Sequence, residues 1–187
     1  AVTGTTPFTD LTNDWYQDAI LWAYQTGVVA GTSATTFDPE SPVTREQIAA
    51  TLYRMAGSPA VDAPSGFTDV ADGQWYSDAI AWAAANGIVN GVSETSFDPD
   101  AAITREQMAA ILYRYAAYWE LDVSAEADLS AYEDASSVSA YAQAAMQWAV
   151  ANGVINGTSA TTLEPAGTAT RAQAATVLVR FQNSMKS

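Results

Sequence analysis

The chain has 187 residues, and 49% of them are hydrophobic, which is enough for a sizeable core. The net charge of -14 disfavours nucleic acid as a ligand, because nucleic-acid binding needs a basic surface. The absence of Cys and His excludes disulfides, thiolate nucleophiles, imidazole metal ligands and His-dependent triads. Among the common catalytic and metal-binding chemistries, carboxylate chemistry and the binding of a cation by oxygen ligands remain.

No stretch of 18 consecutive apolar residues is present, so we expect a soluble protein that does not insert into a membrane. Because the sequence begins at Ala1 and shows no signal-peptide pattern, we expect a mature or excised fragment.

Three copies of one sequence unit follow one another along the chain. The segment from Trp15 to Ala23 recurs 60 residues later, and a glycine turn recurs at Gly27, Gly87 and Gly153. Stretches rich in Pro, Ser, Ala or acidic residues separate the copies and are typical of linkers. We therefore divide the chain into three repeats that together form one domain: 1–57, 58–117 and 118–187.

Each repeat predicts a helix, a glycine turn and a second helix. In the first repeat, the first helix is expected over 15–26 and ends at Gly27, which can adopt the left-handed conformation common after helices. The second helix starts after Thr44, which forms a capping-box pattern with Gln47. A single hairpin cannot bury both apolar faces. The sequence thus predicts a mainly all-α fold in which three helix-loop-helix repeats form a pseudo-threefold, three-lobed domain with a central helical bundle.

Six of the seven basic residues occupy two equivalent positions on the second helices. The arginines nearer the C-terminal end of the helix place a positive charge at the negative end of the helix dipole, which is favourable, and we interpret them as structural. The others lie in the first turn, where a cation adds to the positive end of the dipole, so local stability does not explain them. With the free N–H groups of the helix start they predict an anion site for carboxylate or phosphate; the alternative is an ion pair with an acidic residue of the chain. The first-turn set is Arg45, Arg105 and Arg171, and the other set is Arg54, Arg114 and Arg180.

Three further repeated sets have both a structural and a ligand-binding interpretation. Tryptophans on the first helices belong to the core or stack on sugar rings, and the aromatic residues at helix starts present the same choice. Aspartates before these helices cap a turn or accept sugar hydroxyls, and glycines supply turn geometry or close approach to a ligand. The sets are Trp22, Trp82 and Trp148; Trp15, Trp75 and Tyr141; Asp10, Asp69 and Asp134; and Gly31, Gly91 and Gly157.

The order of these motifs resembles the S-layer homology repeat. In the first copy its marks are Phe8 with Asp10, Trp22 with Ala23, the turn 27–31, the segment 37–39 and the helix start 44–47, and the resemblance extends over 8–181. It implies a non-covalent anchor that binds a secondary cell-wall polysaccharide of bacteria, often through pyruvylated N-acetylmannosamine. It also implies an extracellular location at the cell wall or S-layer, a peptidoglycan-associated surface as partner, a monomeric pseudo-trimer, and no enzymatic activity, cofactor or metal.

The resemblance assigns the groove arginine of the family to Arg45, Arg105 and Arg171, and further groove roles to the Asp, Trp and Gly sets headed by Asp10, Trp22 and Gly31. The third repeat departs from the family pattern, since Leu163 replaces a Phe and Tyr132 another. We therefore expect a degraded third groove and dominant sites at Arg45 and Arg105.

Two other function classes remain as alternatives. A glycoside hydrolase needs one asymmetric pair of carboxylates, whereas the acidic residues here recur at equivalent places. A calcium-dependent or acidic-surface protein-interaction module would use oxygens such as those of 38–40 and 98–100, although neither segment forms a twelve-residue calcium loop.

Overall fold

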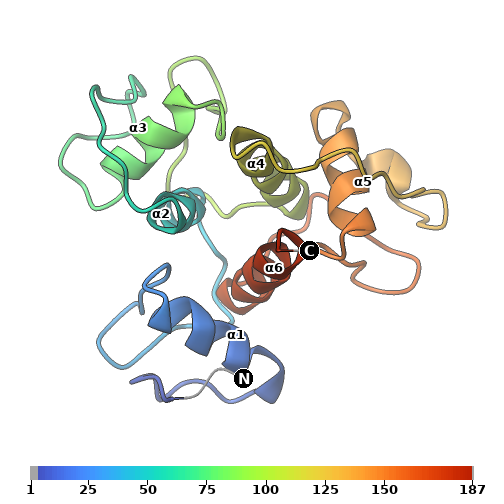
Figure 1. Cartoon of the computed structure of the whole chain (residues 1–187), viewed down its shortest axis with the longest axis horizontal. Helices are drawn as coiled ribbons and strands as arrows, with labels where there is room; N and C mark the ends of the chain where they lie inside the picture. The colour runs from blue at the N-terminus through green and yellow to red at the C-terminus, as the bar shows by residue number, and fades with distance from the viewer. Residues whose placement is uncertain (1–3, 187) are drawn as a thin grey trace.

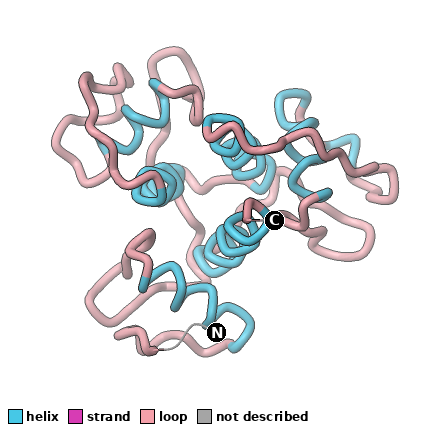
Figure 2. The backbone as a smooth tube through the Cα atoms, in the orientation of Figure 1, coloured by secondary structure: helices cyan, strands magenta, loops and turns pink. Residues whose placement is uncertain are grey.

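The computed structural model describes residues 4–186, and this part of the chain is mainly helical, as the sequence predicts (Figures 1 and 2). None of its helices is long and apolar enough to cross a membrane. The α-helices are α1 (Asp14–Gln25), α2 (Arg45–Met55), α3 (Ser77–Ala85), α4 (Arg105–Tyr118), α5 (Gln143–Ala151) and α6 (Arg171–Ser184), and two short 3-10 helices precede α5, η1 (Ala135–Ser137) and η2 (Ala140–Ala142).

The second helices of the repeats lie in the middle of the molecule, and the first helices lie outside them (Figure 1). The main helix pairs join consecutive repeats: α2 packs against α3, and α4 against α5. The third pair closes the circle, because α6 packs against α1. Each lobe in Figure 1 is therefore built from two repeats.

The helix boundaries follow from local interactions that the sequence predicts. At the start of α2, Thr44 Oγ1 accepts from the Gln47 amide and Gln47 Oε1 accepts from the Thr44 amide, and α4 and α6 begin with the same capping box. The glycine after each first helix has a positive φ, 73° at Gly27, 68° at Gly87 and 63° at Gly153. Both predictions are confirmed.

A ring of three backbone hydrogen bonds joins the segments that precede the central helices. The Val43 amide donates to the Ala169 carbonyl (2.9 Å), the Ala169 amide to Ile103 (3.3 Å) and the Ile103 amide to Val43 (2.9 Å). Because each repeat donates to one neighbour and accepts from the other, the ring fixes the three helix starts relative to one another.

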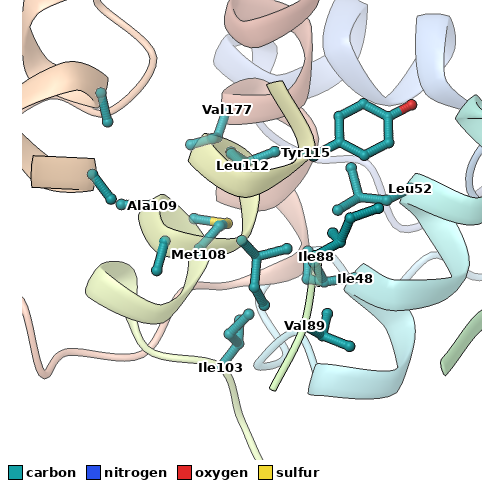
Figure 3. Packing of buried hydrophobic residues seen from close by; sticks show 14 of the residues in the cluster. Ile48, Leu52, Ile88, Val89, Ile103, Met108, Ala109, Leu112, Tyr115 and Val177 are labelled. Atoms are coloured by element: carbon teal, nitrogen blue, oxygen red, sulfur yellow. The ribbon is translucent and has the colours of Figure 1, made fainter. Parts of the chain in front are cut away.

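The apolar core is divided unequally. Side chains from α2, α4 and α6, including Leu52, Leu112 and Val177, belong to one large cluster that also contains the cores of the α3 and α5 lobes (Figure 3). The α1 lobe has a separate, smaller cluster around Tyr16 and Phe37. The α1 lobe thus depends on fewer buried contacts than the other two.

Candidate functional site

The Arg45 side chain crosses from α2 to the second repeat. Its Nε donates to the Phe97 carbonyl (2.9 Å) and its Nη2 to the Asn90 carbonyl (2.9 Å). The guanidinium also stacks on the Phe97 ring, with Cζ 4.5 Å from the ring centroid. Arg45 is thus buried, and its guanidinium is held along one edge by the two carbonyls and on one face by the Phe97 ring.

Arg171 makes the same contacts with the first repeat, because α6 closes the circle. It donates to the Phe37 and Ala30 carbonyls (2.8 and 2.9 Å), and its guanidinium lies 4.5 Å from the centroid of the Phe37 ring. Arg105 likewise donates to the Leu163 and Asn156 carbonyls (2.7 and 2.5 Å). Leu163 offers no aromatic ring, however, and Arg105 is only half-buried.

The partners of these arginines are neutral carbonyls, so the predicted alternative of an ion pair within the chain is wrong for the described residues. Burial lowers the pKa of Arg45, whereas the nearby carboxylates of Asp98 and Asp69 raise it. Since a guanidinium stays protonated in proteins, the buried positive charge persists. Within residues 4–186, Nη1 of Arg45 has no hydrogen-bond partner, which leaves the outer edge of the fork for a ligand.

The backbone N–H groups at the helix starts are already paired, which corrects the second part of the predicted anion site. At α2, the Arg45 amide donates to the Ala101 carbonyl (3.0 Å) and the Glu46 amide to Pro99 (2.8 Å). The corresponding amides of α4 and α6 donate to carbonyls of the following repeat in the same way. An anion at these positions would therefore meet side chains and not the helix backbone.

Two cavities beside these arginines define the candidate site. Groove 1 has a volume of about 450 Å³ and groove 2 of about 400 Å³, which are ordinary sizes for small-ligand sites. Each takes side chains from all three repeats. Groove 1 is lined chiefly by Ala30, Gly31, Thr32, Gln47, Thr51, Arg54, Trp75, Arg171 and Ala174. Groove 2 is lined by Arg45, Asn90, Gly91, Val92, Gln107, Ala110, Ile111, Arg114 and Tyr141.

Two arginines of the second set, Arg54 and Arg114, line the grooves, which the sequence interpretation missed. Groove 1 contains Arg54 together with Arg171, and groove 2 contains Arg114 together with Arg45. Arg54 alone lies in a last helical turn, because α4 and α6 continue beyond Arg114 and Arg180. The sequence did contain a feature that indicates a role for these residues, because a second arginine recurs in every repeat although the chain has few basic residues.

The aromatic residue that borders each groove belongs to the helix-start set and not to the set to which the resemblance assigned a groove role. Trp148 is fully buried in the described part of the chain and Trp82 is buried among aromatic rings, so both are core residues, which corrects their expected ligand role; Trp22 is half-buried against the same core. Trp75 in groove 1 is 57% exposed and Tyr141 in groove 2 is 54% exposed.

The aspartates support the groove loops. Asp69 accepts hydrogen bonds from the amides of Phe97 (2.9 Å) and Asp98 (2.7 Å), and it therefore fixes the carbonyl that receives Arg45 Nε. Desolvation raises the pKa of Asp69, but these hydrogen bonds outweigh it and lower the pKa overall. Asp10 and Asp134 accept from the equivalent amides of the first and third repeats. All three aspartates hold the loops whose carbonyls accept hydrogen bonds from the first-turn arginines.

The glycines permit close packing of the groove turns. A Cβ at Gly31 would lie 2.5 Å from the Phe8 ring and 2.6 Å from the Ser33 carbonyl oxygen, and Gly91 and Gly157 are equally confined. Gly31 and Gly91 also line the two grooves. Their first role is therefore structural, and it brings the turn backbone to the groove surface.

The family model for the S-layer homology domain matches residues 7–49, 66–109 and 131–175. The chain belongs to the S-layer homology domain family. Its three matches coincide with the sequence repeats, which confirms the predicted resemblance. The structure further shows that each groove in this S-layer homology domain combines residues of three repeats.

Similar proteins are much longer than this S-layer homology domain. The Surface-layer 125 kDa protein of Lysinibacillus sphaericus is 36% identical over 88% of this chain but 14% of its own length. The Endoglucanase of Bacillus sp. (strain KSM-635) is 36% identical over 92% of this chain and 18% of its own. The S-layer protein of Bacillus thuringiensis subsp. finitimus is 29% identical over 92% and 21%. The chain thus spans about a fifth or less of these relatives.

Proposed function

We propose that the chain is a non-enzymatic cell-surface anchoring module that binds secondary cell-wall polysaccharide outside the cell through its grooves. The membership of the S-layer homology family supports this role, as does the similarity to surface-layer proteins and to an enzyme of which the chain matches a small part. The ligand group would be a carboxylate, such as the pyruvate ketal on N-acetylmannosamine.

The observation that carries the proposal is the pair of arginines in each groove beside one exposed aromatic ring. A guanidinium grips a carboxylate through two parallel hydrogen bonds, and Arg45 and Arg171 keep an outer edge unoccupied in the described residues. The rings of Trp75 and Tyr141 offer flat apolar faces for a sugar. Two arginines in a negatively charged protein concentrate positive potential where the ligand carboxylate would bind.

The grooves at Arg45 and Arg171 should dominate, which revises the ranking expected from the sequence. That ranking placed Arg171 in the degraded third repeat. Arg171 instead lies on the intact loop of the first repeat, whereas Arg105 lies on the loop with Leu163. The ring that supports the other two arginines is thus missing under Arg105.

Calorimetric titration of the protein with purified wall polysaccharide tests the proposal. Binding should be lost after mild acid has removed the pyruvate ketals. Arg114→Ala and Arg54→Ala should each weaken one class of sites by about tenfold or more, because a charge-assisted hydrogen bond contributes about 1.5–3 kcal/mol. Arg180→Ala, at the equivalent place in the third repeat, is the matched control and should have the smallest effect.

Binding that survives both ketal removal and the arginine substitutions would exclude the carboxylate as the recognised group. Absence of binding to the intact polysaccharide, with the protein folded, would overturn the anchoring function itself.

A further inference from the structure

A buried carboxylate contacts Tyr141, the aromatic residue that lines groove 2. Glu106, in the first turn of α4, is 7% exposed. Its Oε2 accepts from the Ser139 amide (2.8 Å), and its Oε1 accepts from the Ser139 hydroxyl (2.7 Å) and from the Tyr141 hydroxyl (3.5 Å). Glu106 therefore ties the segment around η2 to α4 and holds the ring that borders groove 2.

The other two repeats do not share this arrangement. The residue equivalent to Glu106 is Glu46 in the first repeat, and in the described chain it makes no side-chain hydrogen bond. It is Ala172 in the third repeat, and it belongs to the core of the α1 lobe. The aromatic residue next to Glu46 along the circle is Trp75, which has no hydroxyl group for such a contact.

We propose that Glu106 is a positioning residue that locks Tyr141 over groove 2 and turns its phenol oxygen into an acceptor for a sugar hydroxyl or amide proton. This inference rests on the proposed carbohydrate-binding function.

The chemistry follows from the hydrogen-bond capacities. A phenol has one proton, and once this proton is directed to Glu106 the oxygen can only accept. Trp75 in groove 1 carries an indole N–H, which can only donate. The two grooves therefore prefer different ligand groups next to the carboxylate. Groove 2 prefers a hydrogen-bond donor of the ligand, and groove 1 prefers a hydrogen-bond acceptor of the ligand. Arg45 and Arg114 line groove 2 together with Tyr141, so the phenol lies in the same groove as the two guanidiniums that would hold the carboxylate.

The test isolates each groove in turn. Arg54→Ala with Trp75→Ala disables groove 1 through exposed or half-buried side chains, and titration with pyruvylated wall polysaccharide then reports on groove 2. In this background Glu106→Gln should raise Kd about three- to tenfold, because a side chain that binding must immobilise costs about 0.5–1.5 kcal/mol. The matched control is Glu46→Gln in a chain whose groove 2 is disabled by Arg114→Ala with Tyr141→Ala, and its Kd should not change.

Two further readouts separate positioning from a general loss of structure. Once Tyr141→Ala has removed the ring, Glu106→Gln should add no further loss of binding at groove 2; a loss of the same size would overturn the proposal. Amide hydrogen exchange without ligand should be at least tenfold faster at Ser139 in Glu106→Gln than in the unmodified protein, and an unchanged rate would overturn it as well. If no variant binds polysaccharide, the proposed function fails, while the exchange experiment still decides whether Glu106 holds the segment.

Discussion

Replacing Arg45 by Ala should destabilise the domain far more than replacing Arg54. Arg45 makes two charge-assisted hydrogen bonds and stacks on Phe97, and the substitution would leave two carbonyl oxygens without their donor. Hydrogen bonds from charged donors contribute about 1.5–3 kcal/mol each and the stacking about 0.5–2 kcal/mol, but the desolvation cost of the guanidinium offsets part of this. We expect a net loss of about 2–4 kcal/mol, or roughly 5–12 °C in Tm for a domain of this size.

Urea denaturation and thermal melting followed by circular dichroism measure this loss. Arg54→Ala is the matched control, because Arg54 makes one long hydrogen bond, 3.4 Å to the Val28 carbonyl, and should cost less than about 1 kcal/mol. Equal melting temperatures for the two variants would refute the conclusion that the first-turn arginine joins one repeat to the next. A large difference would also mean that binding data for Arg45→Ala must be collected below its transition.

Three further outcomes follow from the structure. Gly91→Ala should lose about 1–3 kcal/mol in urea denaturation, because its Cβ would lie 2.6 Å from the Phe67 ring. The lowered pKa of Asp69 means that its carboxylate stabilises the fold above the unfolded pKa of about 3.9 and that this contribution is lost as the pH falls through the folded value. The gap in Tm between the unmodified protein and Asp69→Asn should therefore be full near neutral pH and should narrow below about pH 4. In native-state hydrogen exchange, amides of α1 should open at lower free energy than those of α3, because the core of the α1 lobe is a separate and smaller cluster; equal protection would contradict this division.

Local features of the fold could be predicted from the sequence because neighbouring residues determine them. The capping box of Thr44 with Gln47 and the left-handed Gly27 depend on a few adjacent positions, and the structure has both. The pairing of helices depends on contacts between different repeats, such as Arg45 with Phe97 and Arg171 with Phe37, and no periodicity within a repeat reveals them. The ranking of the grooves expected from the sequence used the repeat that contains each arginine, whereas the ranking proposed above uses the loop that each arginine contacts.

The burial of the aromatic residues shows a second limit. Trp82 and Trp75 are seven positions apart, about two turns, so helical periodicity places them on similar faces. Trp75 nevertheless borders groove 1 and is exposed, whereas Trp82 is buried in the core. Trp15 is equally exposed although it lies within α1, so the exposure of this position depends on the packing of the lobes and not on helical periodicity.

The spacing of nine residues between the two arginines of a central helix can be explained once the circular packing of the three repeats is known. Nine residues at about 100° each place the side chains on opposite faces of the helix. In α2, Arg45 accordingly borders groove 2 while Arg54 borders groove 1. The α2 helix therefore contributes one arginine to each of the two grooves, and each groove contains two arginines from different repeats, Arg54 with Arg171 in groove 1 and Arg45 with Arg114 in groove 2. Deletion of any one repeat would therefore remove side chains from both grooves, and a single repeat cannot form either of them.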